Sequence, residues 1–129
     1  MRIHQIITET TNNLPEFIYH GCDEIDLGLI ATDGLVATLK NRDRWHEGDG
    51  TSRGRNHYLL YFTMEPSDYG DVVLRVRKSH IPTRLRWEED ESRAQEEYYF
   101  YSKKPFSFPP NIIEMWDAEN NIWRPITEI

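Results

Sequence analysis

Apolar and aromatic residues fall in short runs along the chain, and turn-forming residues separate most of these runs. Two runs rich in aromatic residues, "HYLLYFT" at 57–63 and "EEYYFYSKKP" at 96–105, predict strands, and Pro105 ends the second. The stretch "EPSDYG" after the first run is typical of a turn. Further strands are indicated by apolar or alternating residues at 16–20, 71–78 and, more weakly, 83–90.

The last segment, "NIIEMWDAENNIWRPITEI" (111–129), predicts a hairpin, because two apolar runs flank the turn-forming "DAENN". Near the N-terminus, "DEIDLGLIATDGL" (23–35) has apolar residues near helical spacing, with Asp23 as a candidate helix cap and Gly34 as a stop. Five or six strands and one or two short helices predict an α+β fold dominated by sheet. A chain of 129 residues fits one compact domain, 1–129.

Residues 40–57 interrupt this pattern with three glycines and no apolar period, which predicts a long mobile loop. The loop holds five cations and three acids, whereas 88–97 holds six acids and one arginine. The formal net charge of −7 argues against general nucleic-acid binding, which needs a basic surface. A basic loop in an acidic protein suits one small anionic ligand, with two solvated loops as the alternative.

Several classes of site are disfavoured. The five histidines show neither an HExxH motif nor paired spacing, so no metal site is expected. Cys22 is the single cysteine, which excludes an internal disulfide and a cysteine-rich zinc site. The stretch "GDGTSRG" at 48–54 follows no predicted strand, so it fails as a dinucleotide-binding fingerprint. No apolar run is long enough to span a membrane or to form a signal peptide, so we expect a cytoplasmic protein.

The stretch "FIYHGC" (17–22) places an imidazole and then a glycine after an apolar run. One interpretation is that His20 ends a strand and Gly21 opens a turn. The other is that a ligand lies against the bare main chain at Gly21. His20 and Cys22 share one strand face, so a thiol nucleophile is geometrically possible, but a small buried cysteine is the simpler account.

Three sequence frames occur in a recognisable order. "YHG" (19–21) is followed by "GL" at 34–35, "LLYFT" (59–63) precedes a turn, and "EEYYFY" (96–101) precedes "FPPNII". In this order the chain resembles the ADP-ribosyltransferase fold, in the branch with a His-Tyr-Glu signature shared by poly(ADP-ribose) polymerases and diphtheria-like toxins. The resemblance spans roughly residues 17–117. It implies a single ADP-ribosyltransferase-like domain whose mostly antiparallel strands form a split sheet.

The resemblance also implies an activity and roles for site residues. NAD would be the co-substrate, and a macromolecule, most simply a protein, would accept ADP-ribose. Glu97 would stabilise an oxocarbenium-like transition state, and His20 would hydrogen-bond the adenosine ribose. Tyr61, helped by Tyr69, would stack on the cationic nicotinamide ring. The main chain of Gly21 would pair with the carboxamide of that ring.

Other positions enter by charge or spacing. Arg53 and Arg55 are the expected partners of the NAD pyrophosphate, because their loop is basic. Gln95 stands two residues before Glu97, a Gln-x-Glu spacing that resembles asparagine-modifying toxins of the other branch and implies acceptor recognition. Two choices stay open at this point. Tyr58 could replace Tyr61, and Glu96, on the opposite strand face, could replace Glu97.

Three functions therefore compete. The first is a small mono-ADP-ribosyltransferase, whose compactness suits a phage or bacterial effector. The second keeps the fold and resembles RNA 2′-phosphotransferases, although these rely on more basic pockets than an acidic chain offers. The third is a catalytically inactive member of the fold that acts as a binding or inhibitor protein through its acidic surface.

Overall fold

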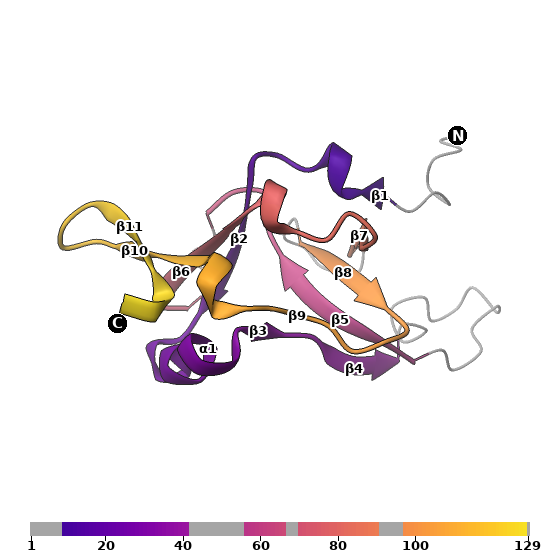
Figure 1. The fold of residues 1–129 in the computed structure, drawn as a ribbon, viewed down its shortest axis with the longest axis horizontal. Helices are drawn as coiled ribbons and strands as arrows, with labels where there is room; N and C mark the ends of the chain where they lie inside the picture. Colours follow the sequence, from indigo (N-terminus) through magenta and orange to yellow (C-terminus); the bar gives the residue numbers. More distant parts are fainter. Residues whose placement is uncertain (1–8, 42–55, 67–69, 91–96, 129) are drawn as a thin grey trace.

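The computed structural model describes residues 9–41, 56–66, 70–90 and 97–128, in which the strands form two antiparallel sheets and a short separate pair (Figure 1). Sheet A, on the right in Figure 1, has the strand order β1-β7-β8-β5-β4. Its strands are β1 (Glu9–Thr10), β7 (Arg86–Glu89), β8 (Tyr98–Ser102), β5 (Asn56–Phe62) and β4 (Thr38–Asn41).

Sheet B, on the left in Figure 1, has the strand order β11-β10-β6-β2. Its strands are β11 (Ile122–Pro125), β10 (Ile113–Asp117), β6 (Val72–Arg77) and β2 (Phe17–Cys22). The separate pair joins β3 (Leu35–Val36) to β9 (Ser107–Phe108). Every strand pair in the described part is antiparallel, so the predicted α+β organisation with mostly antiparallel strands is confirmed.

The helical segments are short. The helix α1 (Leu27–Asp33) follows a 3₁₀ turn at Glu24–Asp26 that Asp23 precedes, and it ends at Gly34 as the sequence predicted. Gly34 has a φ of +81°, and a Cβ there would lie 2.0 Å from the main-chain oxygen of Phe108. Glycine is therefore required where α1 ends against β9. Further 3₁₀ turns lie at Thr11–Asn13, Lys78–His80, Pro110–Ile112 and Ile126–Glu128.

The core forms from alternate side chains of the two sheets. Sheet A contributes Leu60, Phe62 and Phe100, and sheet B contributes Ile18, Leu74 and Val76. Leu74 and Phe100 have no exposed surface. Burial of an apolar side chain of this size stabilises the fold by roughly 1.5–3 kcal/mol. The residues between these positions, such as Tyr61 and Arg75, therefore face away from this core.

Sheets A and B meet through two main-chain hydrogen bonds. The amide of Tyr19 on β2 donates to the oxygen of Thr63 at 2.9 Å, and the amide of Thr63 donates to the oxygen of Tyr19 at 2.8 Å. Thr63 directly follows β5, so this bridge holds the edge strand of sheet B against the end of a central strand of sheet A. Residues next to the bridge on β2 and β5 must therefore be neighbours in space.

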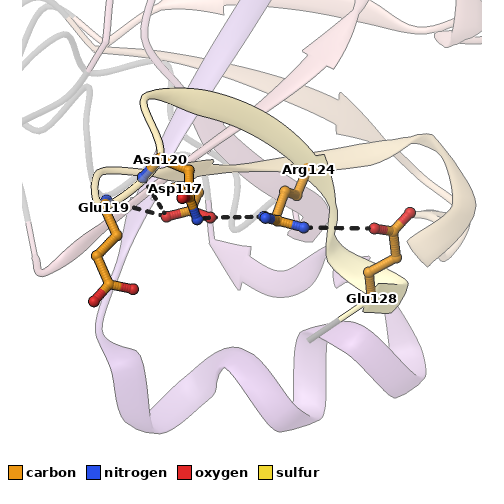
Figure 2. Close-up of polar contacts among 5 residues, drawn as sticks. All are labelled: Asp117, Glu119, Asn120, Arg124 and Glu128. Carbon is orange, nitrogen blue, oxygen red and sulfur yellow. Dashed lines mark hydrogen bonds and ion pairs between the residues drawn. The ribbon is translucent and has the colours of Figure 1, made fainter.

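The predicted C-terminal hairpin is present, and Asp117 organises its turn (Figure 2). One carboxylate oxygen of Asp117 accepts hydrogen bonds from the amides of Glu119 at 3.1 Å and Asn120 at 3.2 Å. The other accepts from Asn120 Nδ2 at 2.8 Å and from Arg124 Nε at 2.6 Å. The Asn120 side chain and then Arg124 lower the pKa of Asp117 to about 2. The turn thus depends on an ionised aspartate.

Two sequence interpretations are wrong in detail. Gly21 does not open a turn, because β2 continues through Gly21 to Cys22 and pairs there with Val73 and Val72. The loop predicted over 40–57 is too long at both ends, because Lys40 pairs with His57 in sheet A. Residues 42–55 of that loop lie outside the described residues. The short strands β1, β3, β4 and β9 were not predicted, because two to four residues are too few to show a period.

Candidate functional site

His20 lies on the core-facing side of β2, together with Ile18 and Cys22. Its ring atom Nδ1 is 2.9 Å from the main-chain oxygen of Tyr61. A carbonyl oxygen can only accept a hydrogen bond, so Nδ1 carries the proton. Burial lowers the pKa of His20 below its usual value, while the bond to Tyr61 and the charge of Glu97 act in the opposite direction. The imidazole is thus neutral at pH 7, and Nε2 is a hydrogen-bond acceptor.

Tyr61 lies on the face of β5 opposite the core. Leu60 and Phe62 belong to the core, and Tyr58 packs against it from the same side of the strand. Tyr61 instead pairs with Tyr99 on β8, with the ring centres 5.7 Å apart and the planes at 57°. Of the two tyrosines left open by the sequence, Tyr61 is the one whose main-chain oxygen bonds to His20 and whose ring lies away from the core, whereas Tyr58 packs on the core side.

Glu97 directly precedes β8, and its main-chain oxygen accepts a hydrogen bond from the amide of Asp90 at 2.9 Å. By strand alternation it shares a face with Tyr99. The ladder that pairs Tyr61 with Tyr99 continues toward Thr63 and Glu97, so Glu97 lies at the junction of the two sheets. Its carboxylate is close enough to raise the pKa of His20. The three frames of the predicted signature are thus brought together.

A second carboxylate supports this row. Glu88 on β7 pairs with Tyr99, and the hydroxyl of Tyr99 donates to Glu88 Oε2 at 2.7 Å. Tyr99 is buried, so this bond fixes the ring that flanks Tyr61 on the β8 side. Tyr61, Tyr99 and Glu88 form one cross-strand row on neighbouring strands. Sequence reasoning assigned no role to Tyr99 or Glu88, although their positions share a strand face with the signature residues.

A cation lies over Tyr61 from the other flank. Lys40 belongs to β4, the strand beside β5 at the edge of sheet A, and its Nζ is 5.0 Å from the ring centre of Tyr61. This distance is within the range of a cation–π interaction. The face of Tyr61 therefore accepts a positive charge. The sequence counted Lys40 among the cations of the predicted loop, but it did not indicate that Lys40 lies over Tyr61.

Gly21 presents main-chain groups to the same junction. In an antiparallel strand the N–H and C=O of one residue point to one side, and the side alternates along the chain. Both main-chain groups of Tyr19 bond to Thr63, so they point away from β6. Those of Gly21, two residues later, point away from β6 as well. Gly21 thus offers a donor and an acceptor next to His20, along the outer edge of sheet B.

Cys22 does not suit nucleophilic chemistry. The side chain is buried. Burial, followed by the charges of Asp26, Asp23 and Asp71, raises the pKa of the thiol to about 11. The thiol remains protonated at neutral pH, so the cysteine behaves as a small core residue.

Five predicted positions lie outside the described residues: Arg53, Arg55, Tyr69, Gln95 and Glu96. Within the described ranges, no three His, Cys, Asp or Glu side chains are grouped so that they could hold a metal ion. Among those same residues, none of the helices has the length and apolar character needed to cross a membrane. No family model, curated protein or solved structure matches this chain.

Proposed function

We propose that the protein is an NAD-dependent mono-ADP-ribosyltransferase that modifies a macromolecular target. The observation that carries this proposal is that His20 bonds to the main chain of Tyr61 and lies within electrostatic reach of Glu97 where sheets A and B join. These residues come from separate sheets and from distant parts of the sequence. The supporting argument is chemical, because each side chain suits a different part of NAD.

His20 suits a ribose hydroxyl. Its Nδ1 proton is committed to Tyr61, and burial keeps the ring neutral, so Nε2 can accept the hydroxyl proton in a hydrogen bond. The bond to Tyr61 also fixes the plane of the imidazole before any ligand arrives. A fixed acceptor binds without the entropy cost of ordering a free side chain.

Tyr61 and Gly21 suit the nicotinamide group. The oxidised ring is flat and cationic, and the face of Tyr61 already accepts the Lys40 ammonium. The amide of the nicotinamide has one carbonyl and one N–H₂ group. The outward N–H and C=O of Gly21 can pair with both. A glycine at this position lets the ligand approach the strand closely.

Glu97 suits the reacting centre. When the bond from the ribose to nicotinamide breaks, its electron pair leaves with the ring, and positive charge develops on the sugar. A nearby carboxylate stabilises that charge most strongly where water is excluded. The acceptor then attacks the sugar and loses its proton, which completes the transfer. Glu97 acts by hydrogen bonding and charge, and no covalent intermediate is required.

A specific observation also favours the binding protein as second candidate. Asp23, Glu24, Asp26 and Asp33 are all exposed around α1, and Ile25 between them has 89% of its surface exposed. An acidic and apolar surface of this kind suits a basic partner protein. This function needs no NAD.

The deciding experiment incubates the purified protein with cell lysate and isotopically labelled NAD, followed by mass spectrometry of proteins and nucleic acids. We expect labelled ADP-ribose on a macromolecule and release of free nicotinamide, with neither product from a Glu97→Gln variant. Loss of a 2′-phosphate from RNA, with that phosphate recovered on labelled ADP-ribose, would favour the phosphotransferase-like reaction. Intact NAD together with tight binding of one lysate protein would favour the binding protein.

A further inference from the structure

We infer that Lys40 competes with the nicotinamide ring for the face of Tyr61, where its ammonium is the protein's own cation. This inference rests on the proposed function, because it names a residue that selects among ligands of that site. The direct observation is the position of the Lys40 ammonium, 5.0 Å from the centre of the Tyr61 ring. In this interaction the Lys40 side chain extends from the edge strand β4 over the neighbouring strand β5.

The two flanks of Tyr61 are occupied differently. On the β8 side stands Tyr99, which is buried and held by its hydrogen bond to Glu88 at 2.7 Å. Tyr99 cannot leave without breaking that bond and exposing an aromatic ring. On the β4 side stands Lys40, half-buried on an edge strand and held by a cation–π contact. A ring that stacks on Tyr61 therefore displaces Lys40 and leaves Tyr99 in place.

Charge makes this competition selective. A pyridinium ring and an ammonium cannot share one aromatic face, because two positive charges placed side by side on the same ring repel each other. The oxidised nicotinamide of NAD replaces one cation–π contact with another. The nicotinamide that is released after cleavage is neutral, so it competes less well with Lys40 for the face. The return of Lys40 would thus favour release of the product over rebinding.

The test uses two fragments that lack the pyrophosphate and report on the ring position alone: N1-methylnicotinamide, which is cationic, and nicotinamide, which is neutral. NMR titration gives the affinity of each for the wild-type protein and for Lys40→Met. Loss of the ammonium should tighten both by about two- to fivefold, the worth of an exposed cation–π contact. The cationic fragment should gain the larger factor, because the repulsion is removed as well.

Two variants serve as controls. Lys40→Arg keeps the charge over the ring and should bind both fragments as the wild type does. Lys104→Met removes one positive charge at an exposed position beyond β8, so it tests the effect of net charge alone. The ε-methylene protons of Lys40 add a measurement without ligand. They should be shifted by the Tyr61 ring current in the free protein and return to ordinary values when NAD binds.

Equal fragment affinities for Lys40→Met and the wild type would overturn the inference and leave the proposed function standing. So would a Lys40 signal that stays shifted while NAD occupies the site. If NAD and both fragments fail to bind every variant, the proposed function fails first, and a competition at Tyr61 fails with it. The two failures are therefore distinguishable by whether the wild-type protein binds NAD.

Discussion

The His20 side chain of sheet B donates its Nδ1 hydrogen to the main-chain oxygen of Tyr61 in sheet A, although 41 residues separate the two positions. The acceptor belongs to the main chain, so the orientation of His20 does not depend on the tyrosine ring. Substitution of Tyr61 can therefore remove the aromatic face and leave the imidazole in position. This independence makes the roles of the two residues separable by mutation.

Substitution of Tyr61 and Tyr58 should have different effects. Tyr61→Ala should weaken NAD binding, because it removes the face on which we propose that the nicotinamide ring stacks. Tyr58→Ala should mainly lower stability, by about 1–3 kcal/mol, because Tyr58 packs against the core. Calorimetric titration with NAD and chemical denaturation measure the two effects on the same samples. The assignment of the strand faces would be contradicted if Tyr58→Ala were the variant that loses NAD affinity.

Glu97→Gln should lose nearly all transfer activity and keep NAD binding. The amide preserves the shape of the side chain but removes the charge that, in the proposed reaction, stabilises the transition state. Loss of such a contact typically costs about 2.7–4 kcal/mol, which corresponds to a rate about a hundred to a thousand times lower. Single-turnover release of nicotinamide measures this rate. Glu88→Gln is the matched control, since Glu88 bonds to Tyr99 and is expected to act on the reaction only indirectly. Near-normal transfer by Glu97→Gln would move the role to Glu96 or end the enzyme proposal.

The affinity for NAD should fall at acidic pH through His20. Burial keeps the pKa of His20 below 6.5, so Nε2 remains an acceptor at neutral pH and becomes a donor only at lower pH. A lowered histidine pKa also means that the related contribution to stability is complete above 6.5 and is lost as the pH falls through the folded-state pKa. Titrations with NAD from pH 8 to 5 should show the fall in NAD affinity. His20→Gln, which has no titrating ring, should remove the histidine-dependent part of the slope; an unchanged slope would assign it to another group.

Asp117 should couple the stability of the hairpin to acid pH. Its folded-state pKa of about 2 lies below the ordinary value of 3.8, so its contribution is present above pH 3.8 and is lost as the pH falls toward 2. Asp117→Asn should therefore lower the melting temperature at pH 7, and the difference from wild type should shrink toward pH 2. Glu119→Gln is the control, because Glu119 takes part in the turn through its main-chain amide. An equal loss in both variants would mean that general surface charge, and not the Asp117 contacts, stabilises the turn.

The sequence indicated those elements whose period or turn chemistry is local. Gly34 ended the helix as predicted because its positive φ is a property of one residue. The alternation of side chains along β5 and β8 likewise separated Tyr61 from Tyr58 and Glu97 from Glu96 by strand face. The position of Lys40 could not be predicted, because four residues of edge strand carry no readable period and pairing with β5 is a long-range contact. The hydrogen bond from His20 to Tyr61 could not be predicted from the sequence either, since it depends on how the two sheets pack against each other.

Because the bridge between Tyr19 and Thr63 joins sheets A and B at the candidate site, the geometry of the site depends on how the two sheets pack. A ligand that holds His20 on one sheet and Tyr61 on the other would tie the sheets together like a non-covalent clamp. Its binding free energy would then add to their cohesion, and the melting temperature would rise with ligand concentration. Conversely, a substitution deep in the β2–β6 pairing, far from any ligand atom, would loosen the clamp and lower affinity. The affinity for such a ligand and the stability of the fold would therefore be thermodynamically linked.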